Sequence, residues 1–408
     1  MRVVDILNKK RLGKELSYKE LDFIFNGYFE GNVKDYQMSA LLMAICINGM
    51  TDEEIFALTK IFIDSGDILD FNDFGIIVDK HSTGGIGDKT TLVIAPIVAS
   101  CGVPVIKMSG RGLGYTGGTI DKWESIPGFK VNLTDDKIFK QLKKIGVVAS
   151  SQTANLAPLD KMIYALRDVT STVSSIPLIA SSIMSKKIAG GADKILIDIK
   201  VGKGALLGTR EEAKKLSELM IKIGSFYQRE VRTVISDMNT PLGYMVGNSL
   251  EVLEAMEILK GRQYDTTLSN LCVELATDMV SMGKEISKRD AKLMVLESLN
   301  KGRAYEKFLE LVKAQGGDIE AIKVSSKRQY IKADKSGVIK KIDALEVGKL
   351  SLELGAGRKT KEDKVDHSVG VKLHKLVGET VEKGDVLATL YVKERVNLKD
   401  FENIFDIK

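Results

Sequence analysis

A glycine-rich turn between a strand and a helix is the feature that most restricts how this chain can fold. The run GIIVD, residues 75–79, leads into KHSTGGIGDK, residues 80–89, and TTLVIAPIVAS follows at 90–100 with the length of a helix. Such a turn presents backbone N–H groups and a helix N-terminus, which together can hold an anion. The patterns G-x-x-x-x-G-K-[ST] and G-x-G-x-x-G do not occur here. An anion site and a simple tight turn therefore both stay open.

The middle of the chain alternates β-branched runs with glycine-rich loops and helical stretches. The runs are GIIVD, TLVIAPIVAS, VPVIKM, KILIDIK and TVISDM. This alternation predicts an α/β domain with a mainly parallel or mixed sheet over residues 70–157 and 190–329. A helical insertion at 158–189 interrupts it.

The first 68 residues predict a small helical domain, with 158–189 as its second part. Ser17 with Glu20, and Thr51 with Glu54, fit the S/T-x-x-E capping box of a helix start. Between them, residues 38–49 are mostly apolar, which suits a buried helix.

The last part of the chain, residues 330–408, predicts a small all-β domain of barrel-sandwich type. Its expected strands are SGVIKKID, SLELGAG (351–357), VGVKLHKL and VEKGDVLATLYV. The turn before VLATLYV resembles biotinyl and lipoyl carrier domains, but no lysine occupies the hairpin that such carriers modify, so a structural role is favoured. The predicted fold class is α/β, with a helical domain, a larger mixed-sheet domain and this C-terminal subdomain.

The composition excludes several classes of protein. The 408 residues include 60 basic and 55 acidic side chains, and only 6% are aromatic. This balance argues against a dedicated nucleic-acid binder. No apolar stretch reaches the roughly 18 residues of a membrane span. The three cysteines form no C-x-x-C pair and the N-terminus is too charged for a signal peptide, so we expect a cytoplasmic protein without disulfides or zinc.

Candidate site residues gather in the two glycine-rich runs. If the strand continues into the first run, Lys80 and Ser82 face one side and His81 the other. A lone histidine is often structural, but this one lies inside the candidate anion site. The second run, 109–119, follows VPVIKM and holds five glycines, which suggests close backbone approach to a ligand. A long flexible loop is the alternative there.

The helical insertion contains two polar pairs at helical spacing. Tyr164 and Arg167 are three residues apart, and Ser182 and Lys186 are four apart, so each pair shares a helix face. Cationic groups with hydroxyl partners suit a planar ring rich in carbonyls. Taken alone, each pair also fits a solvated helix face.

These motifs resemble those of the pyrimidine-nucleoside phosphorylases and thymidine phosphorylases. The matching runs are KHSTGGIGDK, KMSGRGLGYTGGTIDKWESIPGF, YALRDVTSTVSSIPLIASSIMSKK and ISDMNTPLGYMVGNSLEV. The resemblance covers essentially the whole chain. It implies a helical and an α/β domain with a cleft between them, a small C-terminal domain, and a homodimer formed through the helical domains. It also implies inorganic phosphate as co-substrate and no required cofactor.

The resemblance assigns roles position by position. Phosphate binding falls on Lys80, Ser82, Thr91, Ser109 and Thr119. The pyrimidine site falls on His81, Tyr164, Arg167, Ser182 and Lys186, with Leu113 packing near the base. His81, Arg167 and Lys186 are the candidate catalytic residues, because they would stabilise the negative charge that bond cleavage leaves on the pyrimidine. His81 is also a candidate proton donor, since an imidazole exchanges protons near neutral pH, and the two roles stay open.

Further positions bear on specificity and metal binding. Lys107, in VIKMSG, resembles the broad-specificity members, which favours uridine as well as thymidine as substrate. Some of those members hold a monovalent or calcium ion, K+ or Ca2+, and the matching positions here are Gly87, Lys89, Leu242, Met245 and Glu254. Lys89 stands where those members have threonine, and its ammonium would repel a cation. Tyr115 replaces the usual histidine, and KVGKGALL at 200–207 departs from the family's K-x-G-S-G-A-F-M.

The predicted activity is reversible phosphorolysis of uridine, thymidine and deoxyuridine to the free base and an α-pentose 1-phosphate. A strict thymidine phosphorylase is the first alternative. An anthranilate-type phosphoribosyltransferase would need an acidic metal-binding pair, and none is convincingly placed in the sequence. A non-catalytic nucleoside- or phosphate-binding relative would gain little from three donors aimed at a leaving group.

Overall fold

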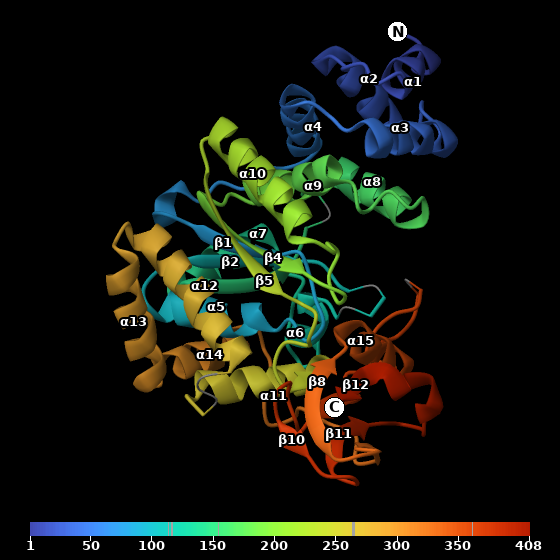
Figure 1. Cartoon of the computed structure of the whole chain (residues 1–408). Coiled ribbons are helices and arrows are strands. Elements are labelled where there is room, and N and C mark those ends of the chain that lie inside the picture. The colour runs from blue at the N-terminus through green and yellow to red at the C-terminus, as the bar shows by residue number, and fades with distance from the viewer. Residues whose placement is uncertain (113, 116, 154, 263–265, 361) are drawn as a thin grey trace. The chain divides into compact units, whose positions relative to one another are not determined.

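The computed structural model describes residues 1–112, 114–115, 117–153, 155–262, 266–360 and 362–408 (Figure 1). The chain divides into two compact units. The first consists of residues 1–81, 153–197 and 210–233, and the second of residues 82–152, 198–209 and 234–408. Three of the five boundaries between them fall inside strands.

The first unit is mostly helical. Its helices are α1 (Val3–Arg11), α2 (Tyr18–Phe29), α3 (Asp35–Asn48), α4 (Asp52–Asp64), α8 (Pro158–Val169), α9 (Ile176–Ala189) and α10 (Arg210–Phe226), with the 3-10 helix η1 (Asn72–Phe74). α9 packs against α4 and α10, and α1 packs against α3. The helical insertion predicted at 158–189 thus forms two helices of this unit.

Two helices begin at the predicted capping boxes. In α2 the Glu20 N–H donates to the Ser17 hydroxyl, and the Ser17 N–H donates to the Glu20 carboxylate. Thr51 and Glu54 repeat the arrangement at α4. Each cap satisfies N–H groups that a helix start leaves unpaired and contributes about 1 kcal/mol.

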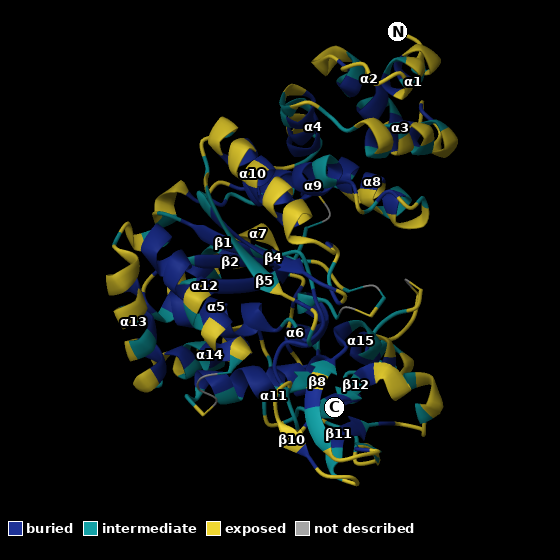
Figure 2. Cartoon of the chain, viewed as in Figure 1, coloured by how far each residue is buried: buried dark blue, intermediate teal, exposed yellow. Residues whose placement is uncertain are grey.

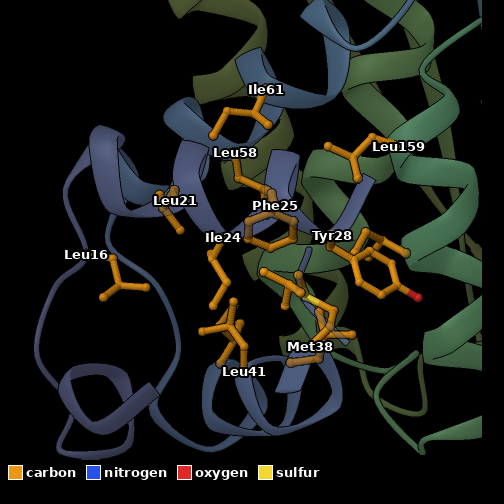
Figure 3. Close-up of a cluster of buried hydrophobic side chains, with 14 of the residues drawn as sticks. Leu16, Leu21, Ile24, Phe25, Tyr28, Met38, Leu41, Leu58, Ile61 and Leu159 are labelled. Carbon is orange, nitrogen blue, oxygen red and sulfur yellow. The ribbon is translucent and has the colours of Figure 1, made fainter. Parts of the chain in front are cut away.

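The hydrophobic core of the first unit joins the N-terminal helices to α8 (Figure 3). Phe25 of α2 and Phe62 of α4 meet edge to face, with ring centroids 5.8 Å apart. Leu159, from the start of α8, is fully buried in the same cluster. Each such buried side chain stabilises the fold by about 1.5–3 kcal/mol relative to its exposed state, so α8 is held firmly against α2–α4.

A five-stranded sheet has the strand order β3-β2-β1-β4-β5. Its strands are β1 (Val78–Ser82), β2 (Val105–Ser109), β3 (Val147–Ser151), β4 (Lys194–Val201) and β5 (Glu230–Asp237). β2 and β3 pair in parallel from Val105↔Val147 to Ser109↔Ser151. The strand predicted at GIIVD begins later, at Val78, and runs to Ser82, so strand geometry does extend into the glycine-rich run.

The second unit is built around one buried helix. Its helices before the C-terminal domain are α5 (Thr90–Ser100), α6 (Thr119–Glu124), α7 (Asp135–Ile145), α11 (Asn248–Leu259), α12 (Thr267–Lys284), α13 (Lys288–Asn300) and α14 (Arg303–Ala314). α5 is buried on all sides, and α11, α12 and α14 pack against it (Figure 2). TLVIAPIVAS has the β-branched composition of a strand but forms this helix, because burial outweighs weak helix propensity.

The C-terminal domain, together with the short strand β6 from earlier in the second unit, forms two small antiparallel sheets, ordered β10-β8-β12 and β6-β9-β11-β7. Their strands are β6 (Met245–Val246), β7 (Arg328–Lys332), β8 (Gly337–Ile342), β9 (Gly370–Leu373), β10 (Thr380–Val381), β11 (Val386–Tyr391) and β12 (Phe405–Ile407). A 3-10 helix, η2 (Leu398–Ile404), precedes β12.

The strand predicted at SLELGAG is wrong. This segment contains the end of helix α15 (Ala344–Glu353), whose first turn is capped by the Asp343 carboxylate. The buried positions Ala344, Val347 and Ser351 recur with a helical period. Most of that period lies before residue 351, which is why the seven-residue window alone suggested a strand.

Candidate functional site

A polar cluster of the first unit forms between α8 and α9. Lys186 Nζ lies 2.6 Å from Asp160 Oδ2 and 3.0 Å from Ser182 Oγ. The Ser182 hydroxyl donates to the same Asp160 oxygen at 3.0 Å. The Asp160 side chain is fully buried, whereas Lys186 keeps 20% of its side chain exposed. A buried carboxylate thus fixes an ammonium that a ligand can still reach.

Tyr164 lies beside this cluster. Lys186 Nζ and Arg167 Cζ are each 5.8 Å from the centre of its ring, within cation–π range. Desolvation, followed by the negative charge of Asp168, raises the pKa of Tyr164 above its usual value. The phenol therefore stays protonated at neutral pH and keeps a hydroxyl donor, and 46% of the residue is exposed.

Arg167 is almost completely buried and organises the segment between α8 and α9. Its Nε, Nη1 and Nη2 donate to the carbonyls of Thr172, Leu178 and Val173 at 3.2, 3.2 and 2.8 Å. Burial lowers the pKa of Arg167, while the negative charge of Asp160 acts in the opposite direction. A guanidinium has five N–H donors, and these carbonyls take three of them. This structural task was not predicted.

Asp160 is a member of the cluster that the sequence patterns did not identify. It precedes Tyr164 by four residues and Arg167 by seven, so the three share one face of α8. Asp160 Oδ1 is buried and accepts no hydrogen bond from the part of the chain that the structure describes. A buried carboxylate oxygen without a donor is costly, so Asp160 Oδ1 is a candidate acceptor for a donor group of a ligand. The helical spacing was the signal that could have found it.

Lys80 and His81 lie in β1, in the first unit. Lys80 is buried and His81 is partly buried. The Lys80 backbone N–H donates to Asp79 Oδ1, and Asp79 Oδ2 forms a buried ion pair with Lys187 of α9. This ion pair holds β1 against α9 where the strand carries both predicted residues.

The glycine-rich run of the second unit folds into a compact turn before α5. The Ser82 hydroxyl donates to Asp88 Oδ2 and accepts the Gly84 N–H at 3.3 Å. Asp88 Oδ1 accepts from the Thr90 hydroxyl at 2.6 Å and from the Thr90 N–H at 3.2 Å. Thr91 is buried in the first turn of the helix. The turn therefore has the strand–turn–helix arrangement that the sequence predicts.

Lys200 is a fully buried cation next to this turn. Its Nζ lies 2.7 Å from Asp198 Oδ2, and its backbone N–H donates to the Thr83 hydroxyl at 2.8 Å. Burial acts to lower the pKa of Lys200, but the charges of Asp88 and Asp198 outweigh it and leave the pKa raised. A permanent positive charge thus accompanies the Ser82–Asp88 turn. Lys200 is the first residue of the KVGKGALL run, but no role was predicted for it from the sequence.

The second glycine-rich run lies between β2 and α6. Ser109 ends β2, Thr119 begins α6, and Lys107 is buried within β2. A Cβ on Gly118 would lie 2.1 Å from the Gly112 nitrogen, so one role of these glycines is close backbone packing within the loop. Leu113, the predicted contact to the base, lies outside the described residues.

Metal clusters and membrane spans are both absent from the residues that the structure describes. No group of three or more His, Cys, Asp or Glu side chains there is placed to hold a metal ion. None of the helices found there combines the length and apolar character of a membrane span.

Comparison with known protein families gives three matches. The description "Glycosyl transferase family, a/b domain" matches residues 75–305, and "Glycosyl transferase family, helical bundle domain" matches residues 4–66. "Pyrimidine nucleoside phosphorylase C-terminal domain" matches residues 338–406. These matches define the chain as a glycosyl transferase with a helical and an α/β domain. They also confirm the predicted fold class.

Curated relatives match over almost the whole chain. The pyrimidine-nucleoside phosphorylase of Bacillus subtilis (strain 168) is 49% identical over 99% of this chain and 96% of its own length. The enzyme of Geobacillus stearothermophilus is 48% identical over 99% of this chain and 96% of its own length. The enzyme of Staphylococcus haemolyticus (strain JCSC1435) is 48% identical over 98% of this chain and 94% of its own length. This chain belongs to the pyrimidine-nucleoside phosphorylase family, as the sequence motifs predicted.

A solved structure shares the fold at much lower sequence identity. The anthranilate phosphoribosyltransferase from Thermus thermophilus aligns with a TM-score of 0.61 at 17% identity, covering 76% of this chain and 99% of that chain. At this identity the likeness concerns the fold alone, so it does not favour the phosphoribosyltransferase alternative.

Proposed function

We propose that this chain is an enzyme that catalyses the reversible phosphorolysis of pyrimidine nucleosides in the cytoplasm. The observation that carries the proposal is the cluster of Asp160, Ser182 and Lys186 in a chain of this family. Its three free cysteines suit a reducing compartment. Inorganic phosphate is the co-substrate, and no organic cofactor is needed.

In the proposed reaction a phosphate oxygen attacks C1′ of the sugar from the face opposite the base. The C1′–N1 bond breaks, its electron pair passes to the pyrimidine, and the products are the α-pentose 1-phosphate and the free base after protonation. The phosphate ligands are Lys80, Ser82, Thr91, Ser109 and Thr119. The pyrimidine contacts are His81, Lys107, Leu113, Tyr164, Arg167, Ser182 and Lys186.

Lys186 is the residue that we expect to act on the leaving base. An ammonium has three N–H donors, and Asp160 and Ser182 take two of them. The third can donate to a pyrimidine carbonyl, where negative charge grows as the glycosidic bond breaks. Because Asp160 fixes the ammonium beforehand, little reorganisation is needed at the moment of reaction.

The test is release of free base from uridine, thymidine, deoxyuridine and cytidine, followed by ultraviolet absorbance with and without phosphate. We expect the first three to react only when phosphate is present. Cytidine should react poorly, because its 4-amino group replaces a carbonyl that the cationic groups would bind. Base release without phosphate would contradict phosphorolysis, and turnover of thymidine without uridine would favour the strict thymidine phosphorylase.

We also propose a homodimer formed through the helical part of the first unit, supported by α3. Exposed Tyr36, Ala40, Met43 and Ile47 follow one another at helical spacing and form an apolar stripe on the side of α3 away from the core. Figure 2 shows exposed residues, in yellow, along this helix. Contiguous exposed apolar surface is typical of an interface.

Sedimentation velocity at micromolar concentration tests the dimer. We expect the wild type to sediment as a dimer and Ile47→Asp to shift it toward monomer, because a carboxylate in an apolar interface lacks a partner. Ile221→Asp on α10 is the matched control and should not change the state. A wild type that is monomeric at this concentration would exclude the dimer.

A further inference from the structure

Lys89 lies inside a cage of oxygen atoms in the second unit. Its Nζ is 2.7 Å from the Leu242 carbonyl, 2.8 Å from the Met245 carbonyl and 2.8 Å from Glu254 Oε2. The side chains of Lys89 and Glu254 are both 0% exposed. Each of the three ammonium N–H groups thus has an oxygen partner, away from water.

The cage has the chemistry of a site for a hard cation. Two backbone carbonyls and one carboxylate are ligands that Ca2+ takes in proteins, and these are the positions at which the family resemblance implies a bound ion. A metal ion does not fit here, however. The ammonium already holds the three oxygens, and a second cation beside it would meet a like charge that no solvent screens.

The glycine-rich loop closes the cage from one side. Gly87 has φ +73°, and a Cβ at this position would lie 2.7 Å from the Leu242 carbonyl oxygen and 3.4 Å from Lys89 Nζ. The Leu242 N–H donates to the Ile86 carbonyl at 3.0 Å. The loop and the 242–246 segment therefore touch backbone to backbone, and the Lys89 side chain spans the contact.

Glu254 connects the cage to the rest of the second unit. Besides Lys89, its carboxylate accepts the Tyr244 N–H at 2.7 Å and the Met245 N–H at 2.9 Å. Glu254 belongs to α11, and Met245 belongs to β6, which pairs with β9 of the C-terminal domain. One positive charge thus joins the glycine-rich loop, the 242–246 segment and α11.

We propose that Lys89 is a built-in cation that takes the place of a bound metal ion. Because the charge is attached to the chain, the glycine-rich loop is held in position whatever the K+ or Ca2+ concentration. A built-in charge acts on folding and on ion binding whatever reaction the enzyme catalyses, so thermal unfolding rather than activity tests it.

The wild-type protein gives the first test. Its melting temperature is measured in choline chloride, in KCl and in choline chloride with CaCl2, all at one ionic strength. Choline is too large to enter the cage. We expect no saturable shift with either ion. A saturable rise in melting temperature with K+ or Ca2+ would overturn the proposal.

Lys89→Thr gives the second test, since it removes the ammonium and opens the cage. In choline chloride its melting temperature should fall by about 5 °C or more, because Glu254 is left buried without a counter-charge. KCl or CaCl2 should restore most of that loss in a saturable manner. If the variant folds only when one of these ions is present, the proposal is likewise supported.

Lys301→Thr is the matched control, because Lys301 is an exposed lysine that follows α13 and pairs with Glu297. Its melting temperature should not respond to either ion. A Lys89→Thr protein that melts like the wild type in choline chloride, or whose lowered melting temperature neither ion raises, would refute the built-in cation.

Discussion

Replacing Lys186 by alanine is expected to lower kcat/KM for phosphorolysis of uridine by about 10²–10³-fold, the usual cost of losing one preorganised donor to a developing charge. The substitution removes the only cation that Asp160 and Ser182 hold at the accessible side of their cluster, among the described residues. Steady-state kinetics at saturating phosphate give kcat and KM for the nucleoside.

Two controls make the Lys186 result specific. Lys161→Ala removes an exposed lysine from α8 and should leave kcat/KM within a small factor of the wild type. Calorimetric titration with inorganic phosphate should give the same affinity for Lys186→Ala as for the wild type, because the substitution lies on the pyrimidine side. Wild-type-like turnover of Lys186→Ala would refute its assignment to the base site.

Glu54→Ala is expected to lower the free energy of unfolding of the first unit by about 3–5 kcal/mol. Lys10 Nζ lies 2.7 Å from both carboxylate oxygens of Glu54, and the pair is almost completely buried. The same carboxylate accepts the backbone N–H groups of Leu16 and Thr51. Alanine would therefore leave a buried ammonium without a counter-charge and two N–H groups without an acceptor.

Urea unfolding followed by circular dichroism measures this loss. Glu53→Ala, an exposed neighbour on α4, is the matched control and should change the free energy by less than about 0.5 kcal/mol. The double variant Lys10→Met with Glu54→Leu should recover part of the loss, because no charge is then left buried. A Glu54→Ala protein as stable as the Glu53→Ala control would contradict the importance of this ion pair.

Local signals in the sequence predicted much of the fold. The capping boxes at Ser17 and Thr51 and the strand–turn–helix around KHSTGGIGDK appear as expected, because each depends on neighbours within a few residues. The long shared motifs identified the family for a similar reason, since they are contiguous runs. The strand predicted at SLELGAG is a helix end instead, because the helical period that places its first residues in α15 begins before residue 351.

Contacts between distant residues were not accessible in this way. The helix at TLVIAPIVAS was expected, but the packing of α11, α12 and α14 around it was not, because no pattern within the segment records those neighbours. Asp160 contacts Lys186, which is 26 residues away in the sequence. Three N–H groups of Arg167 donate to backbone carbonyls of the segment that follows α8 and of the start of α9. Which donors stay available to a ligand is thus a property of the packed helices.

Lys89 shows most clearly which properties the sequence determines and which only the tertiary structure decides. The sequence by itself determined that a lysine stands at the implied cation position and that an ammonium there would oppose a second cation, since charge type is a property of the residue. Only the tertiary structure decided where that charge goes. The Leu242 and Met245 carbonyls and Glu254 lie more than 150 positions away along the chain, and folding alone gathers them, without water, around one ammonium.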